Sequence, residues 1–309
     1  MNLLSSASVF GFYTLVSRVL GYLRDILIAV FLGTSVYADA FFVAFRLPNT
    51  FRRLFAEGTF NAAFIPSYSE QKIKGKKLGN KFADEVFNII SIFLILLIII
   101  IEIFTPFIVY IIAPGFYENL EKFNLAVEFT RITFPFLLFV SLSSLLSGIL
   151  NSNNKFAAAA AAPIVLNIVL ILSLFLSFYY DLDIAKSLSI GVTLSGIFQF
   201  LVLLIFTRKF YFPSIFFIKK FNNNIKTFFR KLLPSIFSSG ITQINILIGT
   251  IIASFQSGAV SYLYYADRVY QINLAIAGIA VGTVALPNLA KNVKLKKQNI
   301  IDKLQNRSI

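Results

Sequence analysis

At residues 17–25 the chain reads SRVLGYLRD, and at residues 37–58 it reads YADAFFVAFRLPNTFRRLFAEG. Both stretches lie in runs that are otherwise apolar enough to cross a bilayer. A charge in the hydrocarbon region is expensive, so it nearly always faces a protein interior or a water-filled cavity. The two stretches therefore predict a polytopic membrane protein with a cationic interior, whose natural cargo is an anion.

The composition of the whole chain supports this prediction. Of its 309 residues 57% are hydrophobic, with a mean hydropathy of +0.79, whereas soluble domains are about 45–50% apolar. The sequence holds 0 Cys and 0 His, which excludes disulfides, Cys/His metal sites and histidine acid–base catalysis. We therefore expect no metal, no cofactor and no enzymatic activity. The net charge of +14 indicates basic cytoplasmic loops rather than a nucleic-acid partner.

Apolar stretches of about 18 residues or more are candidate transmembrane helices, and about eight can be drawn here. They cover residues 7–33, 36–66, 84–113, 127–151, 158–180, 186–207, 231–256 and 261–289. Basic residues collect after the second, sixth and eighth of these spans. Those loops lie on one side, which the positive-inside rule makes cytoplasmic together with the N-terminus. The predicted fold class is an all-α polytopic membrane protein.

The charge pattern and an internal similarity predict four segments. Tyr37-Ala38-Asp39 recurs as Tyr265-Ala266-Asp267, and an even number of helices between two copies gives parallel repeats, one of the known transporter designs. The segments are an N-terminal lobe of about six helices at 1–208, a basic cytoplasmic loop at 209–230, the first two helices of a second lobe at 231–290, and a basic cytoplasmic tail at 291–309. The loop at 209–230 is either an amphipathic segment on the inner leaflet or a solvated connector.

Charges lie deep in the predicted spans. At about 1.5 Å per residue from Ala7, Arg18 lies roughly 17 Å and Arg24 roughly 26 Å into the first span. Arg24 should point about 100° away from Asp25, which gives this helix two charged faces. The deep positions hold six arginines and four acids, namely Arg18, Arg24, Arg46, Arg52, Arg53 and Arg268 against Asp25, Asp39, Glu57 and Asp267.

The surplus of arginine indicates the cargo. A set that served only structural ion pairs would be nearer balance, because an unpaired buried charge costs several kcal/mol. A guanidinium binds phosphate oxygens bidentately and keeps its proton. Pro48, Gly58 and Pro66 can bend the helices that carry these charges, which suits alternating access. The pattern predicts a phosphate-bearing cargo; the alternative is that pairs such as Arg53 with Glu57 are static ion pairs.

Several motifs, in order along the chain, resemble the MurJ (MviN) family of bacterial lipid II flippases. They are the two stretches quoted above, Ala113-Pro114-Gly115-Phe116, and Tyr264-Tyr265-Ala266-Asp267-Arg268. The resemblance implies the fold of the MOP (multidrug/oligosaccharidyl-lipid/polysaccharide) exporter superfamily, here as one complete six-helix lobe and the start of a second. It also implies a location in the bacterial inner membrane, and translocation of the undecaprenyl-diphosphate-linked peptidoglycan precursor by alternating access.

The resemblance also implies a site. In that family, arginines that match Arg18, Arg24, Arg52 and Arg268 line the central cavity and receive the diphosphate, and acids that match Asp39 and Glu57 are important. These four arginines are therefore the predicted substrate-binding residues. The predicted supporting or gating residues are Asp25, Asp39, Glu57 and Asp267. The expected partners are lipid II, the membrane, and cell-wall synthesis proteins or the missing C-terminal part.

Family members are much longer than this chain, so we expect it to be truncated at its C-terminus and unable to transport by itself. Three alternatives stay open. One is an exporter of another lipid-linked oligosaccharide, and another is a non-transporting membrane partner in cell-wall assembly. The third is a membrane enzyme acting on polyprenyl phosphates, which would need clustered carboxylates; no aspartate-rich motif occurs in the predicted cytoplasmic loops.

Overall fold

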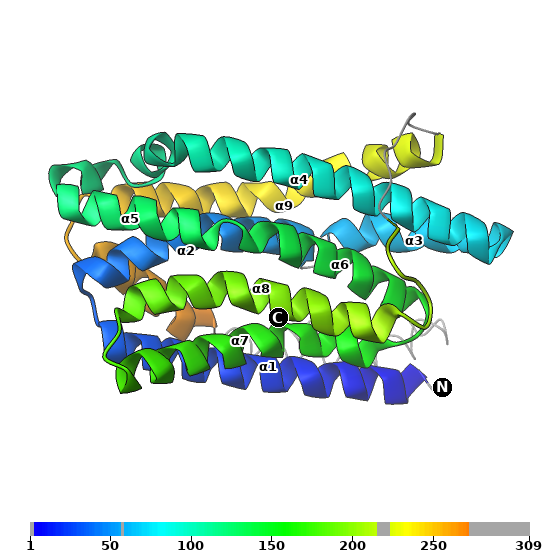
Figure 1. Ribbon diagram of the computed structural model, residues 1–309, viewed down its shortest axis with the longest axis horizontal. Coiled ribbons are helices and arrows are strands. Elements are labelled where there is room, and N and C mark those ends of the chain that lie inside the picture. Colours follow the sequence, from blue (N-terminus) through cyan, green and yellow to red (C-terminus); the bar gives the residue numbers. More distant parts are fainter. Residues whose placement is uncertain (1–2, 57–58, 215–222, 272–309) are drawn as a thin grey trace, which may run out of the picture. The chain divides into compact units, whose positions relative to one another are not determined.

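The computed structural model describes residues 3–56, 59–214 and 223–271, and every regular element in these ranges is helical (Figure 1). The helices are α1 Leu3–Leu32, α2 Val36–Ala56, α3 Thr59–Lys74, α4 Lys76–Ile112, the 3₁₀ helix η1 Pro114–Glu118, α5 Leu120–Thr133, α6 Phe136–Ser152, α7 Phe156–Tyr179, α8 Ile184–Thr207 and α9 Asn223–Ala253. Residues 259–271 are also helical. The predicted all-α fold class is confirmed.

The chain divides into two compact units, residues 1–262 and residues 263–309. The first unit includes α9, which the sequence assigns to a second lobe. The predicted division into lobes at residues 208 and 231 stays a prediction. The predicted tail at 291–309, and the part of the last predicted span beyond residue 271, lie outside the described residues.

Four of the described stretches are long and apolar enough to cross a membrane, namely Lys76–Ile112, Leu120–Ser152, Phe156–Tyr179 and Ile184–Thr207. They correspond to the third to sixth predicted spans. The spans predicted at 7–33 and 36–66 are helical in their described residues and carry charges within their apolar runs; they are not among these four. Within 231–256 the described stretch Gln243–Ala253 is an apolar helix.

Helix boundaries near polar and glycine-containing turns differ from the prediction. The span predicted at 36–66 is helical in its described residues, which α2 covers up to Ala56 and α3 from Thr59. The loop predicted after it is wrong. Its Lys- and Glu-rich residues, which are good helix formers, continue α3 to Lys74, and α4 starts at Lys76 after a turn at Gly75, where φ is 155°.

The helix predicted at 127–151 is also two helices. α5 begins earlier, where the Asn119 side chain accepts a hydrogen bond from the Lys122 backbone N–H at 3.1 Å and so caps the helix. It ends before Pro135, which has no N–H to continue the helix, and α6 follows. In the predicted loop at 209–230, α9 already begins at Asn223.

Within the first unit, α6 and α8 form the centre of the packing. α8 packs against α6 and α7, and α7 packs against α1; α2 packs against α5 and α6, and α3 against α4 and α9 (Figure 1). An aromatic cluster joins the last three of these helices. Phe64 stacks on Phe60 and Phe82 with ring centroids 5.3 and 6.0 Å apart, and Phe228 of α9 meets Phe60 edge-on at 5.7 Å. The cluster fixes α9 to the helices that precede it in the chain.

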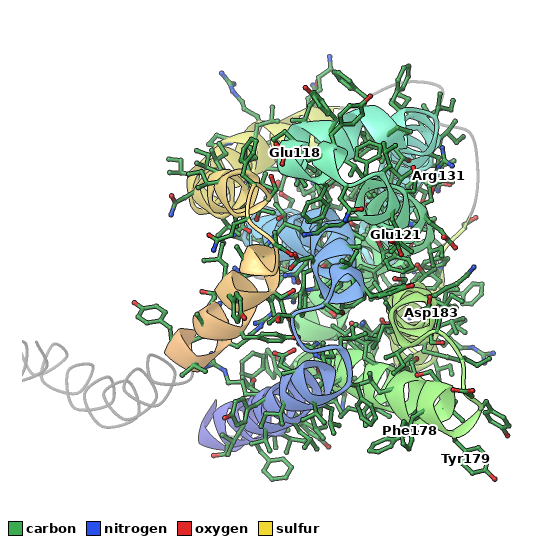
Figure 2. All side chains as sticks on the ribbon, turned by 90° about the vertical axis from the view of Figure 1, so that its left-hand side faces the viewer. Glu118, Glu121, Arg131, Phe178, Tyr179 and Asp183 are labelled. Carbon is green, nitrogen blue, oxygen red and sulfur yellow. The ribbon has the colours of Figure 1, made fainter. Side chains whose placement is uncertain are left out.

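The two ends of the first unit differ in charge. We call the end formed by the turns at residues 33–35, 113–119, 180–183 and 254–258 the acidic end, because it exposes Glu118, Glu121, Asp181 and Asp183. Figure 2 looks onto this end and shows Glu118, Glu121 and Asp183 on it. The opposite end, which we call the basic end, exposes Lys74, Lys76, Lys77, Lys81, Arg208, Lys209, Lys226, Arg230 and Lys231.

At the basic end, α4 anchors the chain that follows α8. Asp84 accepts hydrogen bonds from the Tyr211 hydroxyl at 2.8 Å and from the Ser214 backbone N–H at 2.9 Å, and the Asn88 side chain donates to the Ser214 carbonyl at 2.7 Å. Burial, and then the neighbouring Asp84 carboxylate, raise the pKa of Tyr211 well above its ordinary value. The phenol therefore stays protonated and keeps donating to Asp84.

Candidate functional site

Arg24 of α1 is buried, with 5% of its surface exposed. Its Nε and Nη2 donate to Asp25 Oδ1 at 2.9 and 2.6 Å. The prediction that these two residues form separate charged faces is wrong. The arginine side chain is long enough to turn back to its neighbour, and burial favours the pair because an isolated charge would be costly.

A third residue completes this group from the facing helix. Arg24 Nη1 donates to Asn167 Oδ1 of α7 at 2.9 Å, and Asn167 Nδ2 donates to the Ser17 carbonyl of α1 at 2.9 Å. We call Arg24, Asp25 and Asn167 the arginine triad. Sequence reasoning missed Asn167, although a signal was present, since it is the one polar side chain between Ala157 and Ile171 and such a group needs a partner.

The other predicted arginines of the first unit lie on α1 and α2. Arg18 is exposed on α1, on a part of the helix whose neighbours Leu15, Val19 and Tyr22 are also exposed. Arg52 is half-buried on α2, where its Nε donates to Asn49 Oδ1 at 3.0 Å. That Arg18, Arg24 and Arg52 converge on one anion stays a prediction. The predicted supporting residue Glu57 lies outside the described residues.

Asp39, at the start of α2, is completely buried, with 0% of its surface exposed. Its Oδ2 accepts from the Gly258 backbone N–H at 2.9 Å, and its Oδ1 accepts from the Ser261 backbone N–H and hydroxyl at 2.9 and 2.5 Å. The donors belong to the turn and the first residues of the helix at 259–271. Asp39 lies in the first turn of its own helix as well, so two helix N-termini direct their partial positive charge at one carboxylate.

Lys122 of α5 is the remaining partner of Asp39. Its Nζ lies 2.5 Å from Asp39 Oδ2 and 4.2 Å from the centroid of the Phe116 ring, and the residue is 5% exposed. Lys122 lies between the spans predicted at 84–113 and 127–151, and no local signal in the sequence distinguishes it from a surface lysine. We call Asp39, Lys122 and residues 258–261 the acidic-end latch.

Glycines allow the backbones at the latch to come close. Gly258 has φ 75°, a conformation that side chains other than glycine rarely adopt. A Cβ on Gly115 would lie 2.5 Å from the backbone carbonyl of Ser254, and the Gly115 N–H donates to Ser254 Oγ at 3.1 Å. The start of η1 thus lies directly against the residues that follow α9.

Asp267 and Arg268 lie in the second unit and contact residues of their own helix. Arg268 Nη2 donates to the Tyr264 hydroxyl at 3.0 Å, Nη1 donates to Gln271 Oε1 at 3.2 Å, and the guanidinium lies 4.7 Å from the centroid of the Tyr264 ring. Gln271 Nε2 donates to Asp267 Oδ2 at 2.6 Å. These contacts hold both charged side chains along one helix.

Comparison with known proteins places these features in a family. The family described as "Lipid II flippase MurJ" matches residues 28–309. A probable lipid II flippase MurJ from Rhizobium tropici is 41% identical over 314 residues, which is 100% of this chain and 59% of that protein. The chain thus spans about three fifths of the length of this relative.

Solved structures agree with this family match. A structure of a lipid II flippase MurJ in an inward closed conformation is 32% identical and matches with a TM-score of 0.77, covering 92% of this chain and 59% of that one. A MOP superfamily transporter from Pyrococcus furiosus matches with a TM-score of 0.56 at 16% identity over 91% of this chain, a likeness of fold alone. With the family match extending over residues 28–309, through the latch and Arg268, the chain belongs to the MurJ family, shares the fold of MOP superfamily transporters, and is a multi-pass membrane protein.

Proposed function

We propose that this chain forms the head-group-binding part of a lipid II flippase, which moves the undecaprenyl-diphosphate-linked peptidoglycan precursor across the bacterial inner membrane. One observation carries the proposal, namely the buried Arg24 held by Asp25 and Asn167 between two helices of the bundle. The Asn167 amide of α7 keeps the guanidinium in place. This favours binding, because a guanidinium that is already ordered loses less entropy when it receives an anion.

The diphosphate would exchange with Asp25. It carries more charge than one carboxylate and offers oxygens that fit the guanidinium fork bidentately, whereas Asn167 holds Nη1 and keeps the fork in place. Arg18 and Arg52 would add charge around the same head group. The roles of Arg268, Asp267 and Glu57 remain predictions from the sequence.

We further propose that the acidic end faces the periplasm and that the N-terminus is cytoplasmic, since the exposed lysines of the basic end follow the positive-inside rule. In this orientation the acidic-end latch closes the periplasmic side. Release of residues 258–261 from Asp39 would open that side and let the head group leave while the polyprenyl tail stays in lipid. This is the alternating-access step in which Asp39 has its gating role.

Direct binding tests the cargo. The purified protein in nanodiscs is mixed with labelled lipid II, and unlabelled lipids compete for it. We expect unlabelled lipid II to displace the label at least about tenfold more effectively than undecaprenyl monophosphate, because the second phosphate adds a bidentate contact. A diphosphate-linked O-antigen oligosaccharide that competes better than lipid II would favour the related exporter. Failure of lipid II to bind, with co-purification of cell-wall enzymes, would favour a non-transporting partner.

A further inference from the structure

We propose that Lys122 is a positioning residue of the acidic-end latch: its ammonium keeps the Asp39 carboxylate directed at residues 258–261, and so determines how firmly the latch closes. The inference rests on the latch proposed above. It concerns a residue of α5 that makes no contact with those latch residues in the described hydrogen bonds and ion pairs, and that acts through Asp39.

Asp39 is completely buried. Taking a carboxylate out of water costs several kcal/mol, and the backbone N–H groups of Gly258 and Ser261 offset only part of that cost. These donors leave when the latch opens. Without a permanent cation, the opened state would hold a carboxylate with no buried partner.

Lys122 supplies that cation from a rigid position. Its side chain is 6% exposed, its ammonium lies over the ring of the fully buried Phe116, and its backbone N–H is fixed by the cap of Asn119. None of these contacts involves residues 258–261. Lys122 therefore stays with Asp39 in either state of the latch, and the two residues form a fixed half against which the other half closes.

The distribution of hydrogen bonds between the two carboxylate oxygens of Asp39 supports this role of Lys122. Oδ1 accepts both bonds from Ser261, and Oδ2 accepts from Gly258 and from Lys122. A carboxylate offers about four acceptor positions, so the ammonium occupies one of them and leaves the others aimed at the helix start. A carboxylate without Lys122 would be free to rotate away from Ser261.

The experiment uses the absence of cysteine from the sequence. Val260, within the latch, is 0% exposed, so Val260→Cys reports opening through its rate of reaction with a hydrophilic maleimide, measured on the protein in nanodiscs. Ala83→Cys, at an equally buried position in α4, reports general loosening. Lys122→Met removes the charge and keeps the length, and Lys122→Arg keeps the charge. Lys186→Met, at an exposed lysine paired with Glu128, is the matched control.

We expect Lys122→Met to speed labelling at Val260→Cys by roughly tenfold, within the range of coupling between sites. Lys122→Arg and Lys186→Met should each leave the rate within about twofold, and labelling at Ala83→Cys should not change. Asp39→Asn should also speed labelling, and adding Lys122→Met to it should give no further increase, because the lysine acts through the carboxylate.

The outcomes separate the two proposals. If Asp39→Asn leaves labelling at Val260→Cys unchanged, Asp39 does not hold the latch closed, and the proposed role of Lys122 is overturned as well. If Asp39→Asn speeds labelling but Lys122→Met does not, or if the two effects multiply, the latch stands and the role of Lys122 is overturned. Faster labelling at Ala83→Cys in Lys122→Met would likewise overturn it, because the lysine would then only support packing.

Discussion

Asn167 connects α7 to α1 through two hydrogen bonds, one of them to the buried charge of Arg24. Replacing it with Leu keeps the volume but removes both bonds. We expect Asn167→Leu to lower the free energy of unfolding by about 1–3 kcal/mol, since a buried guanidinium N–H and a carbonyl lose their partners. Denaturant unfolding in detergent measures the change.

The matched control is Asn124→Leu, at an exposed asparagine of α5. It should leave the free energy of unfolding within about 0.5 kcal/mol of the unchanged protein. Equal stability of Asn167→Leu and the unchanged protein would mean that the arginine triad does not hold Arg24, and the preorganised site would lose its basis.

Single residues also show why part of the site could not be predicted. Arg24 and Asp39 stand out in the sequence because they are charges within apolar runs. Lys122 does not, because its burial depends on α5 packing against α2, a contact between residues that lie 83 positions apart. Asn167 was predictable only in part, since its apolar surroundings are visible in the sequence but its partner is not.

At the scale of elements, η1 lies against the residues that follow α9 through Gly115. A Cβ there would approach the Ser254 backbone to 2.5 Å, so Gly115→Ala must displace one of the two backbones. We expect a loss of about 1–3 kcal/mol of stability, measured as a lower melting temperature. Gly11→Ala in α1, where a Cβ would meet nothing within 4 Å, should be neutral or stabilising. A neutral Gly115→Ala would contradict this close approach.

The hydrogen bond from Tyr211 to Asp84, which holds the connection after α8, makes the stability of the protein depend on pH. The pKa of Tyr211 is raised in the folded state above the ordinary value of 10.0 by burial and by Asp84, so above about pH 10 the folded protein binds more protons than the unfolded chain and stability falls as pH rises. The stability difference between the unchanged protein and Tyr211→Phe should therefore be present at pH 8 and shrink above pH 10. A difference that grows above pH 10, in unfolding measured at both values, would contradict the buried neutral phenol.

The boundaries of elements were predictable where apolar runs end in turns and not where charged residues continue a helix. α7 and α8 match the predicted spans within a few residues. The end of α3 and the start of α4 were missed because their lysines were interpreted as a loop, although lysine is a good helix former. The end of α5 before Pro135 was not predicted, because a proline within an apolar helix can also kink the helix without ending it.

At the scale of the whole molecule, orientation follows from the two ends. In intact cells, an impermeant maleimide should label Tyr180→Cys at the acidic end, and it should label Lys77→Cys at the basic end only after the membrane is permeabilised. Both positions are exposed and the sequence has no other cysteine. The reverse pattern would place the N-terminus and the basic end outside and would remove the periplasmic role of the latch.

The central claim is that the buried arginine of the triad binds a diphosphate head group, and one measurement tests it most directly. Lipid II binding is compared between the unchanged protein, Arg24→Ala, and Arg131→Ala at an exposed arginine of α5. The account predicts that Arg24→Ala weakens binding by at least about tenfold, as expected when a charged hydrogen bond worth about 1.5–3 kcal/mol is lost, and that Arg131→Ala binds as the unchanged protein does. Equal binding by Arg24→Ala and the unchanged protein would contradict it.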